Sequence, residues 1–85
     1  MSEIERSVAR CIAQSLGLTE GDVGAAGFEL TNAATFSSFA LLEMVVRLEE
    51  TFSISVPDKD LTLERFASVA SISQYVRERQ GALGS

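Results

Sequence analysis

The stretch of residues 38–52, SFALLEMVVRLEETF, constrains the fold most, because its large apolar side chains recur at the spacing of an α-helix. One group of them falls within an arc of about 100° on a helical wheel, the width of a face that a helix buries. The group comprises Leu41, Met44, Val45, Leu48 and Phe52. We therefore expect a core helix over residues 38–52, with Ser37 as its N-cap and Ser38 as its first residue.

The same helix carries a second apolar stripe on its opposite side. The stripe and the acidic residues around it are Phe39, Leu42, Val46, Glu43, Glu49 and Glu50. One explanation is that the long loop before the helix covers the stripe, or that scattered exposed apolar residues have no role. The other explanation is a docking face for partner proteins, on which apolar contacts give affinity and the carboxylates steer a basic partner.

Two further stretches predict helices that pack against this one. Residues 3–16 carry an apolar stripe between Ser2, a candidate N-cap, and Gly17, a candidate stop. Residues 68–80 carry apolar side chains at the same spacing, with Ser68 as a candidate N-cap. Each stretch is long enough for a helix that buries one face in a shared core.

The connections between these helices carry their own signals. Residues 17–37 form a long, glycine-rich connection, in which residues 19–23 are expected to form one helical turn. Four apolar residues are expected to hold this connection on the core: Leu18, Val23, Phe28 and Leu30. After a turn at Pro57, residues 61–66 predict a short third helix capped by Thr62.

Together these elements predict an all-α fold, a small four-helix bundle with three main helices, one short helix and a long loop between helices one and two. We expect one small domain over residues 1–85, with a frayed tail over about residues 81–85.

Composition excludes several classes of function. Histidine is absent, the only cysteine is Cys11, and the net charge is −5. No catalytic residues and no metal ligands are therefore predicted, and neither nucleic acid nor a membrane is expected as a partner. Cys11 lies on an apolar stripe and is expected to be a buried core residue. We expect a monomer in the reducing cytoplasm.

The two serines before the central helix have more than one possible role. Either hydroxyl can cap the free amides at the helix start, and capping is the simplest reading for both. The same position also favours a phosphate, because free amides and the helix dipole converge there. No histidine exists to activate a serine as a nucleophile, and no lysine is close in sequence. A modification of either serine would therefore require another enzyme.

Residues 38–61, SFALLEMVVRLEETFSISVPDKDL, resemble the phosphopantetheine attachment region of acyl and peptidyl carrier proteins, and the helices on either side fall in the order of that family. The family pattern is roughly Leu-Gly-x-Asp-Ser-Leu, then a helix with an apolar-Glu-apolar element, then Leu-Glu-Glu-x-Phe and a turn with Pro-Asp. Counting back without gaps from Leu-Glu-Glu-Thr-Phe at residues 48–52 aligns Ser38 with the modified serine and Glu43 with the mid-helix glutamate.

The resemblance implies a free-standing, non-catalytic carrier with 4′-phosphopantetheine covalently attached to Ser38. It implies a phosphopantetheinyl transferase as one partner, and as others a loading ligase or acyltransferase and downstream biosynthetic enzymes with basic docking patches. These enzymes would dock on the second stripe and its acids. The chain departs from the pattern at Ser37, where the family has aspartate, at Phe39, where it has leucine, and at residues 34–35, where it has Leu-Gly. A degenerate carrier-like interaction domain without the arm is the alternative.

Overall fold

The computed structural model describes the backbone of residues 2–84 and the side chains of residues 2–81, and it is built from helices. In chain order the elements are α1 (Glu3–Leu16), α2 (Glu20–Val23), the 3₁₀ turn η1 (Leu30–Asn32), α3 (Ser38–Phe52), the 3₁₀ turn η2 (Asp58–Asp60) and α4 (Val69–Gly84). No strand occurs within the described backbone. The predicted all-α bundle of three main helices and one short helix is confirmed.

Local signals fix the ends of α1 where the sequence predicts them. Ser2 and Glu5 form a capping box, in which the Glu5 amide donates to Ser2 Oγ at 3.2 Å and the Ser2 amide donates to Glu5 Oε1 at 3.1 Å. The hydrogen bonds from Ser2 lower the pKa of the Glu5 carboxyl. Gly17 ends the helix in the left-handed region with φ of +69°, a conformation that glycine adopts without steric cost.

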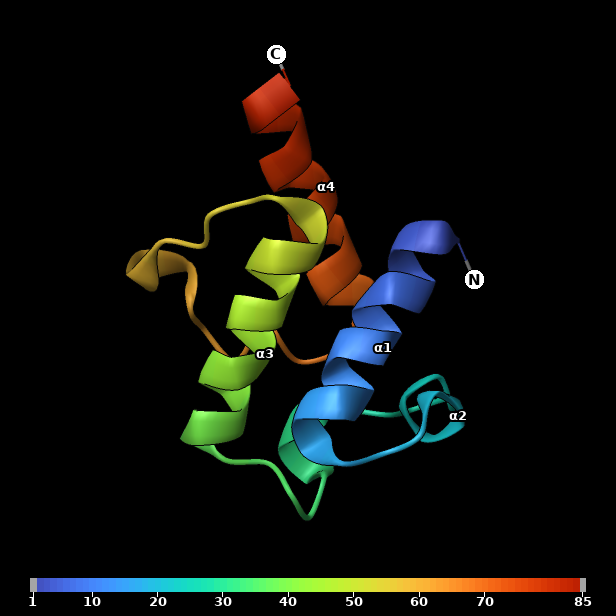
Figure 1. Cartoon of the computed structure of the whole chain (residues 1–85). Helices are drawn as coiled ribbons and strands as arrows, with labels where there is room; N and C mark the ends of the chain where they lie inside the picture. Colours follow the sequence, from blue (N-terminus) through green and yellow to red (C-terminus); the bar gives the residue numbers. More distant parts are fainter. Residues whose placement is uncertain (1, 85) are drawn as a thin grey trace.

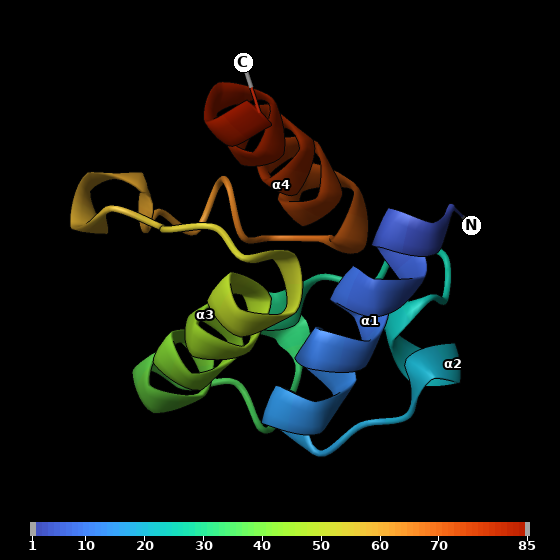
Figure 2. The same cartoon turned by 45° about the horizontal axis from the view of Figure 1, so that its top comes forward.

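The three main helices enclose one core. α1 lies beside both α3 and α4; the axes of α1 and α3 are nearly aligned, and α4 crosses them (Figures 1 and 2). The buried apolar residues of the core include Val8, Cys11, Ile12, Leu16, Met44, Val45, Leu48, Ile72, Tyr75 and Val76. The stripes predicted for the main helices are therefore the faces that the fold buries. Cys11 is a free, buried cysteine, as predicted.

The long connection between α1 and α3 is packed onto this core. Val23 and Leu30 are buried, while Leu18 and Phe28 are partly buried against the core cluster. Thr19 caps the short helix α2, since its Oγ1 accepts a hydrogen bond from the Asp22 amide at 3.1 Å. The predictions of a packed loop and of a helical turn near residues 19–23 are confirmed.

The predicted short helix over residues 61–66 is wrong. The chain there makes one isolated turn, in which the Phe66 amide donates to the Thr62 carbonyl at 3.2 Å and the Arg65 amide donates to Thr62 Oγ1 at 3.2 Å. Phe66 is fully buried, but Leu63 is 55% exposed, so the segment has no apolar face along which a helix could pack. A helix this short is unstable without such packing. The fourth helix of the bundle is instead α2.

The last helix is longer than the sequence predicts. Ser68 caps it, since the Ser71 amide donates to Ser68 Oγ at 3.2 Å, but α4 continues past residue 80 to Gly84. Fraying of residues 81–85 stays a prediction, and residue 85 lies outside the described residues. Among the described helices, none combines the length and the apolar character that crossing a bilayer requires.

Candidate functional site

The start of α3 presents two neighbouring serines in different settings. Ser37 has an extended backbone, and its Oγ accepts a hydrogen bond from the Ala40 amide at 3.0 Å. It is therefore the N-cap, as predicted. Ser38 is the first residue of the helix, and its side chain is exposed. Within the described part of the chain its hydroxyl has no hydrogen-bond partner, so it is free to react or to be modified.

The loop that leads into α3 is anchored at both ends. The Thr35 hydroxyl donates a hydrogen bond to the carbonyl of Leu16 at the end of α1. The Phe36 amide then donates to the Ala33 carbonyl at 3.1 Å, and the Leu41 amide donates to the Ser37 carbonyl at 3.0 Å. These contacts fix the start of α3 next to the end of α1, so Ser38 projects from a defined position.

The electrostatics at Ser38 suit an anion. The amides of Ser38 and Phe39 belong to the first turn of a 15-residue helix, where no carbonyl of that helix can accept from them. The first turn also contains no acidic residue. Free amides and the positive end of the helix dipole favour a phosphate ester on the Ser38 oxygen. The residues present therefore fit a phosphodiester-linked group.

Among the residues with described side chains, none forms a hydrogen bond with the Ser38 hydroxyl that could activate it as a nucleophile. A nucleophilic serine needs an adjacent base, and the chain has no histidine to serve as one. Among the described residues no group of acidic or cysteine side chains is arranged to hold a metal ion.

The second stripe of α3 lies uncovered beside Ser38. Phe39 is 75% exposed, Leu42 53% and Val46 50%. Among the side chains that the structure describes, they are three of the four exposed large apolar residues. At these exposures the loop of residues 17–37 does not cover them, and its large apolar side chains are packed in or against the core instead. The explanation that this loop buries the stripe is therefore excluded. The docking role of the stripe stays a prediction.

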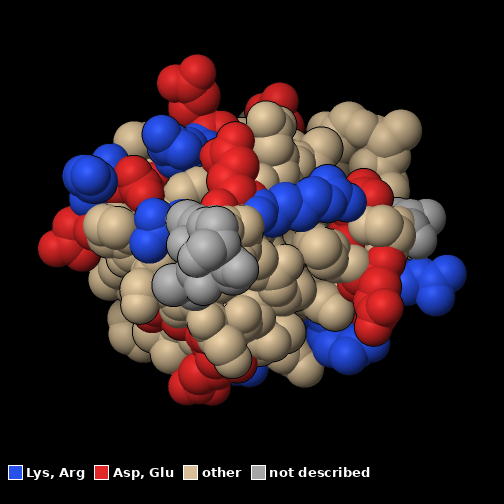
Figure 3. Space-filling view, turned by 90° about the horizontal axis from the view of Figure 1, so that it is seen from above, with Lys and Arg blue, Asp and Glu red and all other residues tan. Residues whose placement is uncertain are grey.

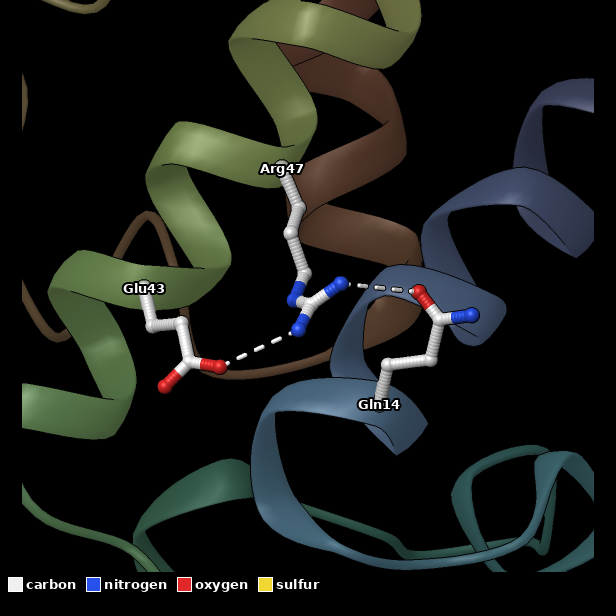
Figure 4. Close-up of polar contacts among 3 residues, drawn as sticks. All are labelled: Gln14, Glu43 and Arg47. Atoms are coloured by element: carbon white, nitrogen blue, oxygen red, sulfur yellow. Dashed lines mark hydrogen bonds and ion pairs between the residues drawn. The ribbon is translucent and has the colours of Figure 1, made fainter.

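The acidic residues around the stripe are not equivalent. Glu43 forms an ion pair with Arg47 at 3.1 Å, and Arg47 also donates to Gln14 Oε1 of α1 at 3.2 Å (Figure 4). Glu49 Oε2 accepts a hydrogen bond from the Val56 amide at 2.9 Å. Glu50 is exposed and has no partner among the described residues. Two of the three predicted docking acids are thus already engaged within the protein.

Sequence reasoning missed the role of Arg47. The spacing of Glu43 and Arg47, four residues apart on one helix, is a known signal for an ion pair. The contact with Gln14 depends on the packing of α1 against α3 and has no local signal. The three residues together form a polar bridge between the two helices, as Figure 4 shows.

The charge distribution and the family comparison complete the description. On the face seen in Figure 3, acidic and basic side chains are interspersed, and no continuous basic patch is visible there. Such a patch is the usual mark of a nucleic-acid interface.

The sequence was also compared with models of known protein families. A family model described as "phosphopantetheine attachment site" matches residues 6–76, which is most of the chain.

Proposed function

The chain belongs to the phosphopantetheine attachment-site family, whose members carry covalently attached 4′-phosphopantetheine, and we propose that it is a free-standing carrier protein with Ser38 as its attachment site. In this role it holds an acyl or aminoacyl group as a thioester and delivers it to separate biosynthetic enzymes. The carrier is not an enzyme in this proposal, because Ser38 has no activating base.

One observation carries the assignment of Ser38. Its hydroxyl is exposed and unpartnered at the first residue of α3, whereas the Ser37 hydroxyl is bonded to the Ala40 amide at 3.0 Å. The alignment of residues 48–52 with the family pattern supports the same residue. Attachment at Ser37 would esterify the hydroxyl that caps the helix, while attachment at Ser38 leaves that cap unchanged.

The attachment step belongs to a phosphopantetheinyl transferase that uses coenzyme A. The Ser38 oxygen loses its proton and forms a bond to phosphorus, the pyrophosphate linkage of coenzyme A breaks, and adenosine 3′,5′-bisphosphate leaves. When attached, the group supplies a thiol on a long flexible arm, which can form a thioester. The amides at the start of α3 would stabilise the negative phosphodiester.

The uncovered stripe of α3 is the proposed docking face for partner enzymes. These are the transferase, a loading ligase or acyltransferase, and downstream biosynthetic enzymes with basic docking patches. Phe39, Leu42 and Val46 would supply apolar contact area, while the negative charge of the domain, −5 overall, would speed encounter. The proposal includes a monomer in the cytoplasm, where the buried free thiol of Cys11 would remain reduced.

Intact-mass measurement tests the attachment site. After incubation with coenzyme A and a broad-specificity transferase, the wild-type protein should gain the mass of one phosphopantetheine group. Ser38→Ala should gain none and should keep the helical circular dichroism of the wild type. Ser37→Ala is the matched control and should still be modified. Peptide mapping that finds the group on Ser37 would overturn the assignment.

The same measurement tests the alternative, a carrier-like interaction domain without the arm. The identity of residue 37 favours this alternative. It is serine where the family pattern has aspartate, so this chain lacks the negative charge that the family pattern has beside the attachment site. Folded wild-type protein that gains no mass with any of several transferases would support it.

A further inference from the structure

A shallow pocket lies between the end of α1, the short helix α2 and the turn η1. Its volume is about 260 Å³, and its apolar lining comes from Leu18, Phe28 and Ala33. These three side chains are partly buried and packed against the core, which holds the lining in place. In Figure 1 the end of α1, the turn η1 and the start of α3 appear at the same end of the molecule, although no described residue of α3 lines the pocket.

The polar part of the pocket is negative. Asp22 and Glu29 line it together with Asn32, and no lysine or arginine is among the described residues that line it. One oxygen of Asp22 accepts a hydrogen bond from the Thr19 amide at 3.3 Å. Glu29 is exposed, and its side chain makes no capping bond to η1. Its carboxylate is therefore available to pair with a cation next to the apolar lining.

The pocket is within reach of a group carried on Ser38. Ala33 precedes Ser38 by five residues, and the hydrogen bond from the Phe36 amide to the Ala33 carbonyl, at 3.1 Å, folds the segment between them. A phosphopantetheine arm has about 14 bonds between the serine oxygen and the sulfur, close to the roughly 15 backbone bonds of five extended residues. A fully extended arm on Ser38 is therefore long enough for its thioester to reach Ala33.

We propose that this pocket holds the cargo of the arm, and that the cargo is an aminoacyl group with a small or medium-sized apolar side chain. The inference rests on the proposed function. The apolar side chain would pack on Leu18 and Phe28, and the α-ammonium would pair with Glu29. A long fatty acyl chain has no cation for this carboxylate, and the pocket is smaller than the roughly 300–1,000 Å³ of sites for drug-sized ligands.

Nuclear magnetic resonance of two loaded forms tests the pocket. The transferase would attach arms from hydrolysis-resistant, amide-linked analogues of leucyl-coenzyme A and 4-methylpentanoyl-coenzyme A, which differ only by the ammonium group. Intact mass would establish that loading is complete. Relative to the unloaded arm, the leucyl form should shift the amide signals of Leu18, Phe28, Asn32 and Ala33. The 4-methylpentanoyl form should shift them several-fold less.

Glu29→Gln should reduce the shifts of the leucyl form to those of the 4-methylpentanoyl form. Glu64→Gln is the matched control, because it removes the same charge from an exposed residue outside this pocket. Equal shifts for the two cargoes, or shifts centred on the polar pocket lined by Lys59 and Arg65, would overturn the inference. Complete loading without shifts would overturn it while leaving the carrier function intact. Failure of the wild-type protein to load with either analogue or with coenzyme A itself, using several transferases, would refute the carrier function, and the cargo site with it.

Discussion

Ser37 and Ser38 have the same side chain, but their hydroxyl groups lie in different surroundings, because Ser37 is the N-cap of α3 and Ser38 is its first residue. The Ser37 oxygen accepts from the Ala40 amide at 3.0 Å, while the Ser38 oxygen faces solvent. Capping by Ser37 is worth about 1 kcal/mol, so Ser37→Ala should lower the free energy of unfolding by that amount. Ser38→Ala should leave stability within about 0.5 kcal/mol, as at other surface positions. Urea denaturation of both variants measures this difference.

Ser37→Asp tests the departure of this residue from the family pattern. An aspartate can accept the same hydrogen bond from Ala40 and adds a negative charge at the positive end of the helix dipole. It should therefore raise the free energy of unfolding by about 0.3–1 kcal/mol. If the transferase reads this charge, modification of Ser38 should also be faster, which a timed mass assay would show. An unchanged or slower rate would mean that the cognate transferase does not depend on the charge.

At the scale of one element, α3 has two apolar faces with opposite settings. Leu48 is fully buried, whereas Val46, two residues earlier, is 50% exposed. Leu48→Ala should cost about 2–5 kcal/mol of stability, because it leaves a cavity in the core. Val46→Glu should change stability by less than about 0.5 kcal/mol. It should weaken transfer to partner enzymes, because a charge would have to be desolvated at the interface.

The comparison of these two variants decides what the exposed stripe does. Denaturant melts would confirm that Val46→Glu is folded, and a loading assay with a partner ligase would then measure transfer. A folded Val46→Glu variant with unchanged transfer would place the docking face elsewhere. Unfolding as severe as that of Leu48→Ala would mean that the stripe contributes to the core after all.

The acids of α3 lead to a separate prediction about salt. Glu43→Lys removes one negative charge, adds a positive one, and breaks the ion pair with Arg47. Exposed pairs of this kind contribute about 0–1 kcal/mol, so the fold should tolerate the change. Association with a basic partner should slow, and the defect should shrink at high salt as screening increases. Stopped-flow binding at two ionic strengths measures it. A defect of the same size at both would argue against electrostatic steering.

The ends of α1 and α3 could be predicted because their signals are local. Ser2 with Glu5, Gly17 and Ser37 act within a few residues of the helix ends that they fix. The secondary structure of residues 61–66 could not be predicted in this way, because it depends on which of their side chains the rest of the fold buries. Phe66 is buried in the core and Leu63 is exposed. The segment therefore forms a single turn, although its sequence pattern predicted a helix.

The site shows the same division between local and tertiary information. The helical wheel separates the two faces of α3, but only the packing of the whole molecule shows that the long loop leaves one face exposed. Spacing also indicates the pair of Glu43 with Arg47, while the bridge to Gln14 requires the approach of α1 to α3. The pocket at Leu18 and Phe28 likewise forms from segments that meet only after folding.

At the scale of the whole molecule, the hydrogen bond between Tyr75 and Asp60 is one of the contacts that tie the α3–α4 connection to the rest of the fold. Tyr75 on α4 is 4% exposed, and its hydroxyl donates to Asp60 Oδ2 at 2.7 Å. Burial, and then the hydrogen bond and charge of Asp60, raise the pKa of Tyr75 to about 12. Because the ordinary pKa of tyrosine is about 10, the folded state favours the neutral phenol.

The stability that this phenol provides is therefore fully present below pH 10 and is lost as the pH rises from about 10 through 12, since unfolding then releases its proton. We expect the free energy of unfolding to fall by about 1–3 kcal/mol across that range. Tyr75 is the only tyrosine, so the near-ultraviolet absorbance of phenolate reports its pKa directly. Tyr75→Phe keeps every other titrating group and should lose this part of the pH dependence, at the cost of leaving Asp60 without its partner. Formation of the Tyr75 phenolate near pH 10 in the folded protein would show that burial and Asp60 do not raise the pKa of Tyr75. It would also mean that the α3–α4 connection is less tightly bound to α4 than the 2.7 Å contact implies.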